Sequence, residues 1–246
     1  MAQGLSRPTP PRRGPDAAHA LNVVEIFGPT LQGEGRLIGC TTMFVRLAGC
    51  DWTCAWCDSA FTWQAGALAP IERLTPDAIV RRLGAAGPTC RRVTLSGGNP
   101  ALQDAGPLVD ELRERGYRVH VETQGSRAPS WLARVDMVTV SPKGPSSNMP
   151  PAWDALAATL RVAAEPDLKV VVFDEADYAF AREVHRRHPT VACTLQAGNR
   201  VGRDRRSRLL ARLRWLAGRT LTDPDMADVR VLPQLHVLLW GNRRGV

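Results

Sequence analysis

Strand-like and helix-like segments alternate along almost the whole chain. Apolar runs typical of buried strands lie at residues 22–27, 42–48, 92–96, 117–122, 136–140, 169–173, 190–195 and 234–240. Amphipathic stretches with helical spacing lie at residues 75–86, 104–115, 151–163, 175–187 and 204–217. This alternation predicts β-α units with right-handed crossovers, and therefore an α/β fold built on parallel strands.

The bulk composition is that of a globular protein. The chain has 246 residues, of which 44% are hydrophobic and 23% charged. We expect one domain over residues 21–246, preceded by a disordered tail over residues 1–20, which is rich in Pro, Arg, Gly and Ala. No apolar run approaches the ~18 residues that span a bilayer, and the first residues do not resemble a secretory signal. We therefore expect a cytoplasmic protein with reduced thiols and no membrane partner.

Polar or glycine-rich motifs follow the ends of several predicted strands. They begin at Cys50, Gly97, Glu122, Ser141 and Gln196. In parallel α/β folds the carboxyl ends of the strands lie along one edge, and ligands bind there. The pattern predicts an active site along this edge.

Three cysteines follow the second predicted strand with the spacing C-x3-C-x2-C: Cys50, Cys54 and Cys57. Three thiolates on one short loop can hold three irons of a 4Fe-4S cluster and leave the fourth open to a small molecule. A zinc site would need a fourth protein ligand, for which Cys40, Cys90, Cys193 or a histidine is available. The spacing alone leaves both interpretations open.

The cysteine loop resembles that of the radical S-adenosylmethionine superfamily, in which an aromatic residue precedes the last cysteine, as Trp56 does here. Within that superfamily the chain looks like the 7-carboxy-7-deazaguanine synthases. The resemblance covers roughly residues 22–242 and rests on TLQGEG at 30–35, FVRLAGC at 44–50, CDS at 57–59, SGGNP at 96–100, VETQG at 121–125 and VSPK at 140–143.

The resemblance implies an open, partial (β/α) barrel with about six core strands. It also implies a lyase of 7-deazapurine (queuosine-type) biosynthesis that converts 6-carboxy-5,6,7,8-tetrahydropterin to 7-carboxy-7-deazaguanine with loss of ammonia. The implied cofactors are a 4Fe-4S cluster, S-adenosyl-L-methionine and Mg2+. The implied partners are a flavodoxin or ferredoxin as electron donor and a second copy of the chain, forming a homodimer.

The same resemblance assigns roles to individual residues. Cys50, Cys54 and Cys57 would hold the cluster, and Ser59 would bind Mg2+ through its hydroxyl. The S-adenosylmethionine site would comprise Trp56, Gly97, Gly98, Asn99, Glu122, Ser141, Lys143 and Gln196. Asn99 stands where the superfamily more commonly has glutamate, so its contact lacks the negative charge. Without the resemblance, the two glycines would be interpreted as a plain turn and Lys143 equally well as a surface lysine.

Substrate-binding residues are assigned in the same way: Leu31, Gln32, Gly33, Glu34, Arg46, Ser96 and His236. An amide and a carboxylate, Gln32 and Glu34, match the donor and acceptor pattern of a pterin edge. Arg46 lies in a predicted strand, where it would pair with a substrate carboxylate or with a carboxylate of the protein. His236 would bind a carboxylate, although a lone histidine in an apolar strand is more often structural.

The net charge of +8 is concentrated near the end of the chain. Residues 200–219 contain eight arginines and one aspartate. A nucleic-acid or anionic-partner site is one interpretation, and a solvated arginine face of an amphipathic helix is the favoured one. We expect no nucleic-acid partner. Two other functions stay open, a different radical S-adenosylmethionine enzyme such as a glycyl-radical activase, and a zinc-stabilised nucleic-acid-binding protein.

Overall fold

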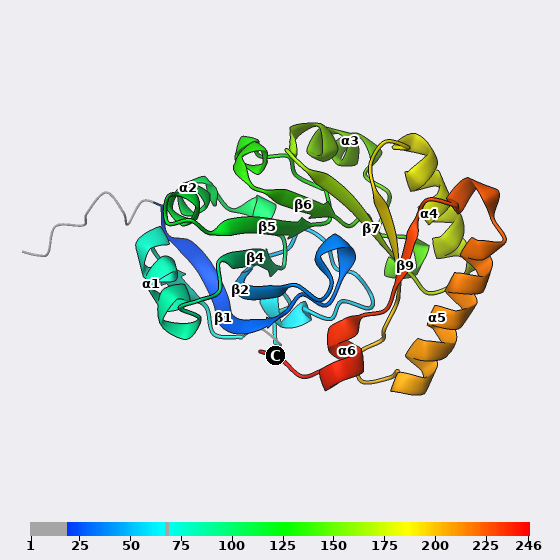
Figure 1. Ribbon diagram of the computed structural model, residues 1–246, viewed down its shortest axis with the longest axis horizontal. Helices are drawn as coiled ribbons and strands as arrows, with labels where there is room; N and C mark the ends of the chain where they lie inside the picture. Colours follow the sequence, from blue (N-terminus) through cyan, green and yellow to red (C-terminus); the bar gives the residue numbers. More distant parts are fainter. Residues whose placement is uncertain (1–18, 67–68) are drawn as a thin grey trace, which may run out of the picture.

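The computed structural model describes residues 19–66 and 69–246. Within these residues nine strands form one sheet in the order β3-β1-β2-β4-β5-β6-β7-β8-β9 (Figure 1). The strands are β1 (Leu21–Leu31), β2 (Thr41–Leu47), β3 (Glu72–Leu74), β4 (Arg92–Gly97), β5 (Arg118–Thr123), β6 (Met137–Val140), β7 (Pro166–Val172), β8 (Cys193–Ala197) and β9 (Arg230–Leu232). The α-helices are α1 (Pro76–Ala86), α2 (Gly106–Glu114), α3 (Trp153–Val162), α4 (Glu175–Arg187), α5 (Arg206–Leu221) and α6 (Leu235–Trp240). The tail predicted over residues 1–20 falls almost entirely outside the described residues.

The predicted α/β fold with parallel core strands is confirmed. From β2 through β4, β5, β6, β7 and β8 to β9, every neighbouring pair is parallel, and the edge strands β3 and β9 do not pair with each other. The barrel is therefore open. The first strand differs from the rest, because β1 is antiparallel to both β2 and β3. Residues 32–40 between β1 and β2 are too few for a crossover, which takes a dozen or more.

The prediction of a strand over residues 234–240 is wrong, because this segment is helix α6. A short apolar run fits a strand or a buried helical turn equally well. The helix turns Val237 into the core and leaves Leu239 and Trp240 48% and 36% exposed. The last strand is instead β9, which pairs with β8.

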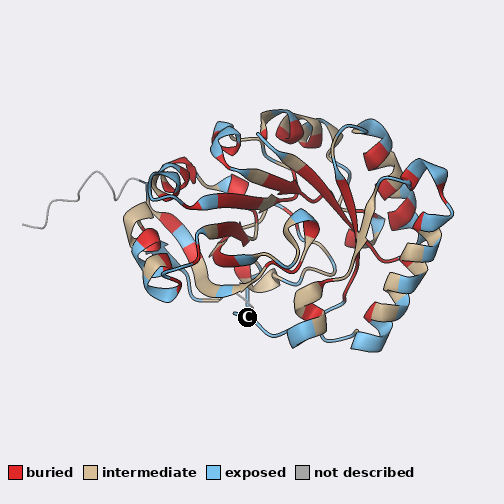
Figure 2. Ribbon diagram, viewed as in Figure 1, coloured by how far each residue is buried: buried red, intermediate tan, exposed pale blue. Residues whose placement is uncertain are grey.

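Side chains of the core strands alternate between two faces. Apolar residues such as Val45, Leu95 and Val121 belong to the core on the helix-covered face. Figure 2 shows much of the central sheet as buried. Polar residues on the other face meet inside the barrel. Thr42, Thr94, His120 and Thr139 of four adjacent strands are buried and joined by hydrogen bonds of 2.9–3.4 Å. Two residues further along β4, β5 and β6, the next inward-facing positions are Ser96, Glu122 and Ser141, at the carboxyl ends of these strands.

Two helix starts follow directly from the sequence. Thr75 caps α1 by accepting a hydrogen bond from Ala78 N–H, and Pro76 occupies the first helical position. Asp174 caps α4 in the same way through Asp177 N–H. Across residues 19–66 and 69–246, none of the helices combines the length and the apolar character required to cross a bilayer.

Candidate active site

One cavity opens at the carboxyl ends of the parallel strands. All but two of the residues predicted for cluster, cofactor and substrate lie on its wall: Leu31, Gln32, Gly33, Glu34, Arg46, Cys50, Cys54, Trp56, Cys57, Ser59, Ser96, Gly97, Gly98, Glu122, Ser141, Lys143 and His236. The two exceptions are Asn99 and Gln196. The residues on the cavity wall lie there because side chains alternate along each strand, so that an inward-facing polar residue lies at the strand end.

The three cysteines of the loop form one side of this cavity. Cys50, Cys54 and Cys57 are free thiols. Burial is the largest cause of the raised pKa of each thiol, and it raises the pKa of Cys57 to about 11. Two N–H groups point at their sulfurs: Gln124 Nε2 lies 3.6 Å from Cys50 Sγ, and Trp63 Nε1 lies 3.4 Å from Cys57 Sγ. Partly buried sulfurs that receive N–H groups suit thiolates bound to a cluster, so this donor set fits a 4Fe-4S group.

Gly97 and Gly98 hold the end of β4 against the start of the cysteine loop. A Cβ on Gly97 would lie 2.3 Å from Leu47 O, and one on Gly98 would lie 2.0 Å from Gly49 O. Gly97 also has a φ of +121°, which favours glycine. Gly98 N–H donates to Leu47 O and Asn99 N–H to Gly49 O, at 3.1 and 2.7 Å. Both glycines therefore permit a close approach of two backbone segments.

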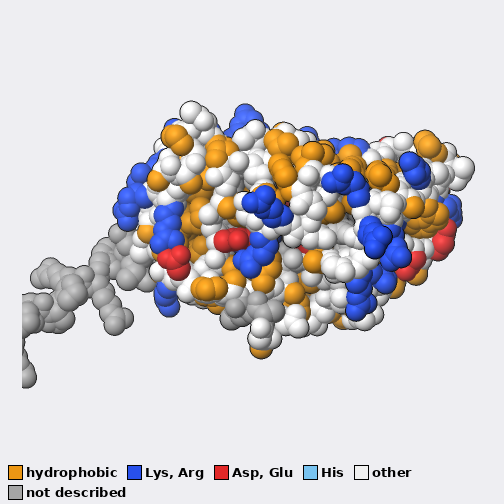
Figure 3. All heavy atoms as spheres, turned by 90° about the horizontal axis from the view of Figure 1, so that it is seen from below, with side chains coloured by type: hydrophobic (Ala, Val, Ile, Leu, Met, Phe, Trp, Pro, Cys, Tyr) orange, Lys and Arg blue, Asp and Glu red, His pale blue; other side chains and the backbone are white. Residues whose placement is uncertain are grey.

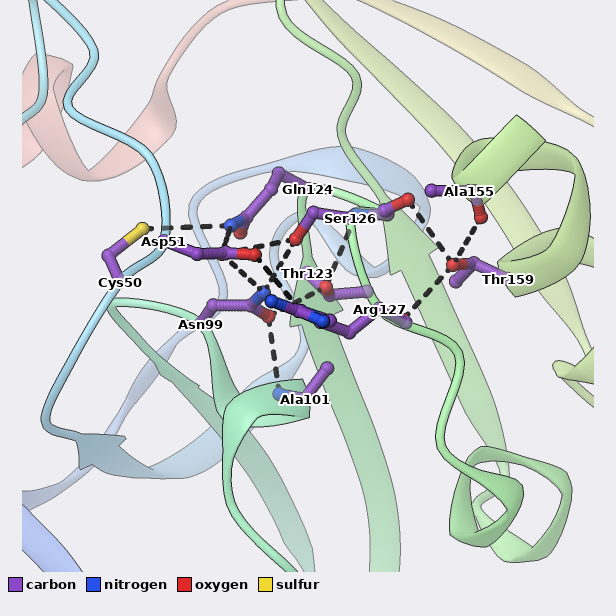
Figure 4. Close-up of polar contacts among 11 residues, drawn as sticks. Cys50, Asp51, Asn99, Ala101, Thr123, Gln124, Ser126, Arg127, Ala155 and Thr159 are labelled. Atoms are coloured by element: carbon purple, nitrogen blue, oxygen red, sulfur yellow. Dashed lines mark hydrogen bonds and ion pairs between the residues drawn. The ribbon is translucent and has the colours of Figure 1, made fainter. Parts of the chain in front are cut away.

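Asn99 does not reach the cavity, because its side chain belongs to a buried network beneath the loop (Figure 4). Its Nδ2 donates to Asp51 Oδ1 and to Ser126 Oγ, and its Oδ1 accepts from Thr123 Oγ1 and Ala101 N–H, at 2.8–3.2 Å. The side-chain carbonyl of Asn99, a residue predicted for the S-adenosylmethionine site, thus already has two donors.

Asp51 is the centre of this network and was not anticipated from the sequence. Its Oδ1 also accepts hydrogen bonds from Gln124 and Ser126, and its Oδ2 lies 3.4 Å from Arg127 Nε (Figure 4). Since Asp51 directly follows Cys50, the network fixes the first cysteine relative to the ends of β4 and β5.

Beside the cysteines, Trp56 and Lys143 lie on the same wall. Trp56 donates to Ser146 Oγ at 2.9 Å, and Lys143 Nζ lies 5.8 Å from the centre of its ring. Lys143 also donates to Ser141 Oγ at 2.9 Å. Burial is the main cause that lowers the pKa of Lys143, while Cys54 and Cys57 oppose that shift. A cationic group beside the cysteines would complement the negative charge of thiolates.

An ion-pair cluster forms the floor of the cavity. Lys169 Nζ binds Glu34 and lies 3.9 Å from Glu122 Oε1, and Gln32 Nε2 donates to the same Glu122 oxygen at 3.3 Å. Burial raises the pKa of Glu34, but Lys169 and His236 outweigh burial and lower it to about 2. Burial likewise lowers the pKa of Lys169, and the two carboxylates more than reverse this, so the lysine stays charged. Lys169 was missed at the sequence level, although a lysine inside a buried strand marks such a pair.

The sequence left two partners open for Arg46, a carboxylate of the substrate or a carboxylate of the protein. The structure shows a carboxylate of the protein, that of Glu25. Arg46 Nε lies 2.9 Å from Glu25 Oε1, and Arg46 Nη1 donates to Ser59 Oγ at 3.1 Å. The guanidinium is also within 5.3–5.8 Å of the ring centres of Phe27, Phe44 and Phe61. The side chain remains on the cavity wall, where a carboxylate of a ligand can reach it.

Ser59 lies within a group of oxygen and nitrogen donors. Its hydroxyl donates to Asp58 Oδ1 at 2.9 Å, and donor atoms of Asp58, Glu34 and His236 all lie within 4.8 Å of one another. Hydroxyl and carboxylate oxygens are ligands of hard cations, so these residues fit Mg2+.

Helix α6 covers the loop that follows β1. Leu235 N–H donates to Gly33 O at 2.9 Å, and Gln234 binds the carboxylate of Glu34. His236 therefore comes to the cavity from a helix and not from the predicted strand. Gln196, in contrast, is fully buried in β8 and donates to Leu232 O of β9 at 3.3 Å, outside the cavity wall.

Comparison with known proteins agrees with this geometry. The model of the radical SAM superfamily matches residues 45–173, which include the cysteine loop and the parallel strands β4, β5, β6 and β7. The chain belongs to this superfamily, whose members use a 4Fe-4S cluster and S-adenosylmethionine.

Comparison with curated relatives identifies the family to which the chain belongs within the superfamily. A 7-carboxy-7-deazaguanine synthase of Bacillus cereus is 47% identical over 233 residues, covering 91% of this chain and 98% of the relative. Another from Bacillus subtilis is 43% identical and covers 93% and 100%. Within the superfamily, the chain therefore belongs to the 7-carboxy-7-deazaguanine synthase family. This decides against a glycyl-radical activase and against a zinc-stabilised nucleic-acid-binding protein.

The fold has a solved counterpart. The crystal structure of QueE from Escherichia coli superposes with a TM-score of 0.66 at 24% identity, covering 90% of this chain and 96% of that chain. This likeness supports the open, partial barrel.

Proposed function

We propose that this enzyme converts 6-carboxy-5,6,7,8-tetrahydropterin to 7-carboxy-7-deazaguanine with loss of ammonia. The observation that carries the proposal is that one cavity is lined both by the cysteines, with Trp56 and Lys143, and by the polar residues Glu34 and Arg46. Family membership and this shared lining together support a radical enzyme that holds a polar, carboxylated heterocycle beside its cofactor.

The cluster and S-adenosylmethionine would supply a carbon-centred radical that abstracts hydrogen from the substrate. The chain itself contributes binding and orientation. Gln32 and the carboxylates of Glu34 and Glu122 offer acceptors and an amide for the amino-pyrimidinone edge of a pterin. Lys169 is buried beside both carboxylates, and it lowers the pKa of Glu34.

The substrate carboxylate is assigned to Arg46. The guanidinium is held by Glu25 and lies beside Ser59. A carboxylate bound there would also approach a Mg2+ ion held by Ser59 and Asp58. One ion pair and one metal contact would together orient the ring that is to be rearranged.

Anaerobic reconstitution with iron and sulfide tests the proposal. We expect brown protein that forms the deazaguanine from the tetrahydropterin, S-adenosylmethionine and dithionite, with product identified by mass spectrometry. Cys54→Ala should lose both iron and turnover, whereas Cys40→Ala, away from the loop, should retain both. Colourless protein with one bound zinc per chain would contradict the proposal.

Magnesium is tested separately. We expect turnover to rise when Mg2+ is added to chelator-treated enzyme, and Ser59→Ala to lose most of this response while keeping its iron. A Ser59→Ala enzyme with an unchanged response to Mg2+ would remove Ser59 from the metal site.

A further inference from the structure

The segment after α6, residues 241–246, returns to the cavity. Gly241 ends the helix with a φ of +67°, which favours glycine. Beyond this turn, Arg243, Gly245 and Val246 lie on the cavity wall. In Figure 1 the segment lies on the lower face of the molecule, and Figure 3, which looks onto that face, shows many blue and few red side chains. The segment therefore belongs to a basic face.

A bulge in β1 places Glu25 beside Arg46. Val23 lies opposite Leu47 and Glu25 lies opposite Arg46, so β1 has one residue more than β2 over this stretch. An extra residue of this kind turns the side chains that follow it to the other face of the strand. Glu25 thereby lies on the same face as the guanidinium assigned to the substrate, and its Oε1 is 2.9 Å from Arg46 Nε.

The second oxygen of Glu25 faces a different arginine. Glu25 Oε2 lies 3.4 Å from Nη2 of Arg244, which belongs to segment 241–246. The side chains of Glu25 and Arg46 are 18% and 21% exposed, whereas that of Arg244 is 51% exposed. One partly buried carboxylate thus bridges a guanidinium of the cavity wall and a guanidinium of the segment. These three side chains have a formal charge of +1, which an anionic ligand can balance.

The ring of Phe61 contacts the same two arginines. Its centre lies 3.6 Å from Arg244 Cζ and 5.8 Å from Arg46 Cζ. Phe61 belongs to the short turn that follows Ser59, and Ser59 Oγ accepts a hydrogen bond from Arg46 Nη1. Segment 241–246 is therefore attached at two points, Glu25 and Phe61, to the residues around Arg46.

We propose that Glu25 is a positioning residue that fixes Arg46 for the substrate carboxylate and anchors segment 241–246 through Arg244. The inference rests on the proposed function, which assigns that carboxylate to Arg46. Glu25 occupies Nε of Arg46 and Ser59 occupies Nη1, so that among the described residues Nη2 has no hydrogen-bond partner. This leaves one edge of the guanidinium for a carboxylate of a ligand.

The first test compares two ligands by anaerobic calorimetry with the reconstituted enzyme, without reductant. The ligands are 6-carboxy-5,6,7,8-tetrahydropterin and 6-methyl-5,6,7,8-tetrahydropterin, which lacks the carboxylate. Glu25→Gln keeps the size of the side chain and removes its charge. We expect it to raise the Kd of the carboxylated ligand about tenfold, because Arg46 loses a charge-assisted contact that holds it in place. The Kd of the methyl compound and the iron content should be unchanged, whereas a purely structural role of Glu25 would weaken both ligands alike.

The second test follows segment 241–246 by hydrogen exchange with mass spectrometry. Its amides should exchange about twofold to fivefold faster in Glu25→Gln and in Arg244→Gln, because each variant removes the same partly exposed ion pair. The double variant should exchange no faster than either single variant. Arg244 is more than half exposed, so Arg244→Gln tests the anchor without disturbing the pairing of β1 with β2.

The matched control is Glu72→Gln, which removes one carboxylate from the exposed pair with Arg82 in the neighbouring strand β3. It should behave as wild type in both tests. An unchanged Kd of the carboxylated ligand in Glu25→Gln would overturn the proposal, as would an equal weakening of both ligands. Unaltered exchange of segment 241–246 in Arg244→Gln would overturn the anchoring. A wild type that forms no deazaguanine would instead reject the proposed function, and that outcome is measured without any of these variants.

Discussion

Gly33 lies directly against the imidazole of His236: a Cβ on Gly33 would stand 2.1 Å from His236 Nδ1. The two residues are 203 positions apart, and they come together because Leu235 N–H donates to Gly33 O. The glycine of the loop after β1 and the histidine of α6 therefore form one unit of the cavity wall. Any side chain on Gly33 displaces the histidine.

Gly33→Ala should accordingly lower kcat/KM for the tetrahydropterin by about tenfold or more, because a clash of this kind typically costs about 1–3 kcal/mol. Iron content should stay constant, since the cysteine loop is not involved. Steady-state kinetics with the reconstituted enzyme measure the effect.

A double-variant cycle separates the clash from other effects of the methyl group. Gly33→Ala/His236→Ala should be no less active than His236→Ala, because the ring that clashes is gone. Gly218→Ala in α5, where a Cβ meets open space, is the control and should be active. If Gly33→Ala retained full activity, the histidine would be free to move and the contact would have no role.

Lys169 holds two carboxylates at the floor of the cavity, so its removal should be costly. Its side chain is 8% exposed and that of Glu34 is 13% exposed. Lys169→Met leaves Glu34 and Glu122 without their cation and should destabilise the protein by about 3 kcal/mol. Thermal unfolding of the holoenzyme under anaerobic conditions, followed by circular dichroism, measures this.

The second substitution Glu34→Gln should recover part of the loss in the Lys169→Met background, since it removes the uncompensated charge. Arg118→Met, at an exposed position, serves as the reference for loss of one cation. A Lys169→Met enzyme with wild-type stability would show that the carboxylates are hydrated or protonated without cost.

Asn99 allows a structural role to be distinguished from a cofactor contact. Asn99→Asp places a second carboxylate where Nδ2 now donates to Asp51 Oδ1 at 3.1 Å. We expect this to destabilise the protein by about 2 kcal/mol, because a donor is lost and two like charges meet. The apparent affinity for S-adenosylmethionine in the remaining folded enzyme should be unchanged. Tighter cofactor binding by Asn99→Asp, measured by calorimetry, would instead support direct contact with the cofactor.

Much of the site was predictable because it depends on local order along the chain. Gly97 and Glu122 lie in the last two positions of β4 and β5, Cys50 and Ser141 follow β2 and β6, and parallel strands place such positions on one edge. What each of these residues binds stays a prediction. The strand ends could be found from apolar runs alone.

Other features depend on contacts across the fold and were not predictable in this way. Lys169 pairs with Glu34, 135 residues earlier, and the continuous burial of β7 does not identify that partner. The segment at 234–240 was too short to distinguish a helix from a strand. Asn99 was assigned from its place in a motif, whereas its partners Asp51 and Ser126 come from different loops.

His120 makes the stability of the fold depend on pH. It is buried inside the barrel between Thr94 and Thr139. The pKa of His120 is lowered from 6.5 to about 3, mainly by burial and further by the positive charges of Lys169 and Arg92. Below pH 6.5 the unfolded chain therefore takes up a proton that the folded chain does not. Its contribution to stability is complete above pH 6.5 and is lost progressively as the pH falls toward 3.

His120→Gln should remove this dependence. The free energy of unfolding of the wild type, from urea titrations between about pH 5 and 7, should fall toward acid more steeply than that of the variant, by up to about 1.4 kcal/mol per pH unit. His19→Gln, at an exposed histidine, should leave the slope unaltered. Parallel pH profiles of wild type and His120→Gln would mean that His120 is protonated in the folded protein. Its ring would then donate through both nitrogens to Thr94 and Thr139, and the polar layer of the barrel would carry a positive charge.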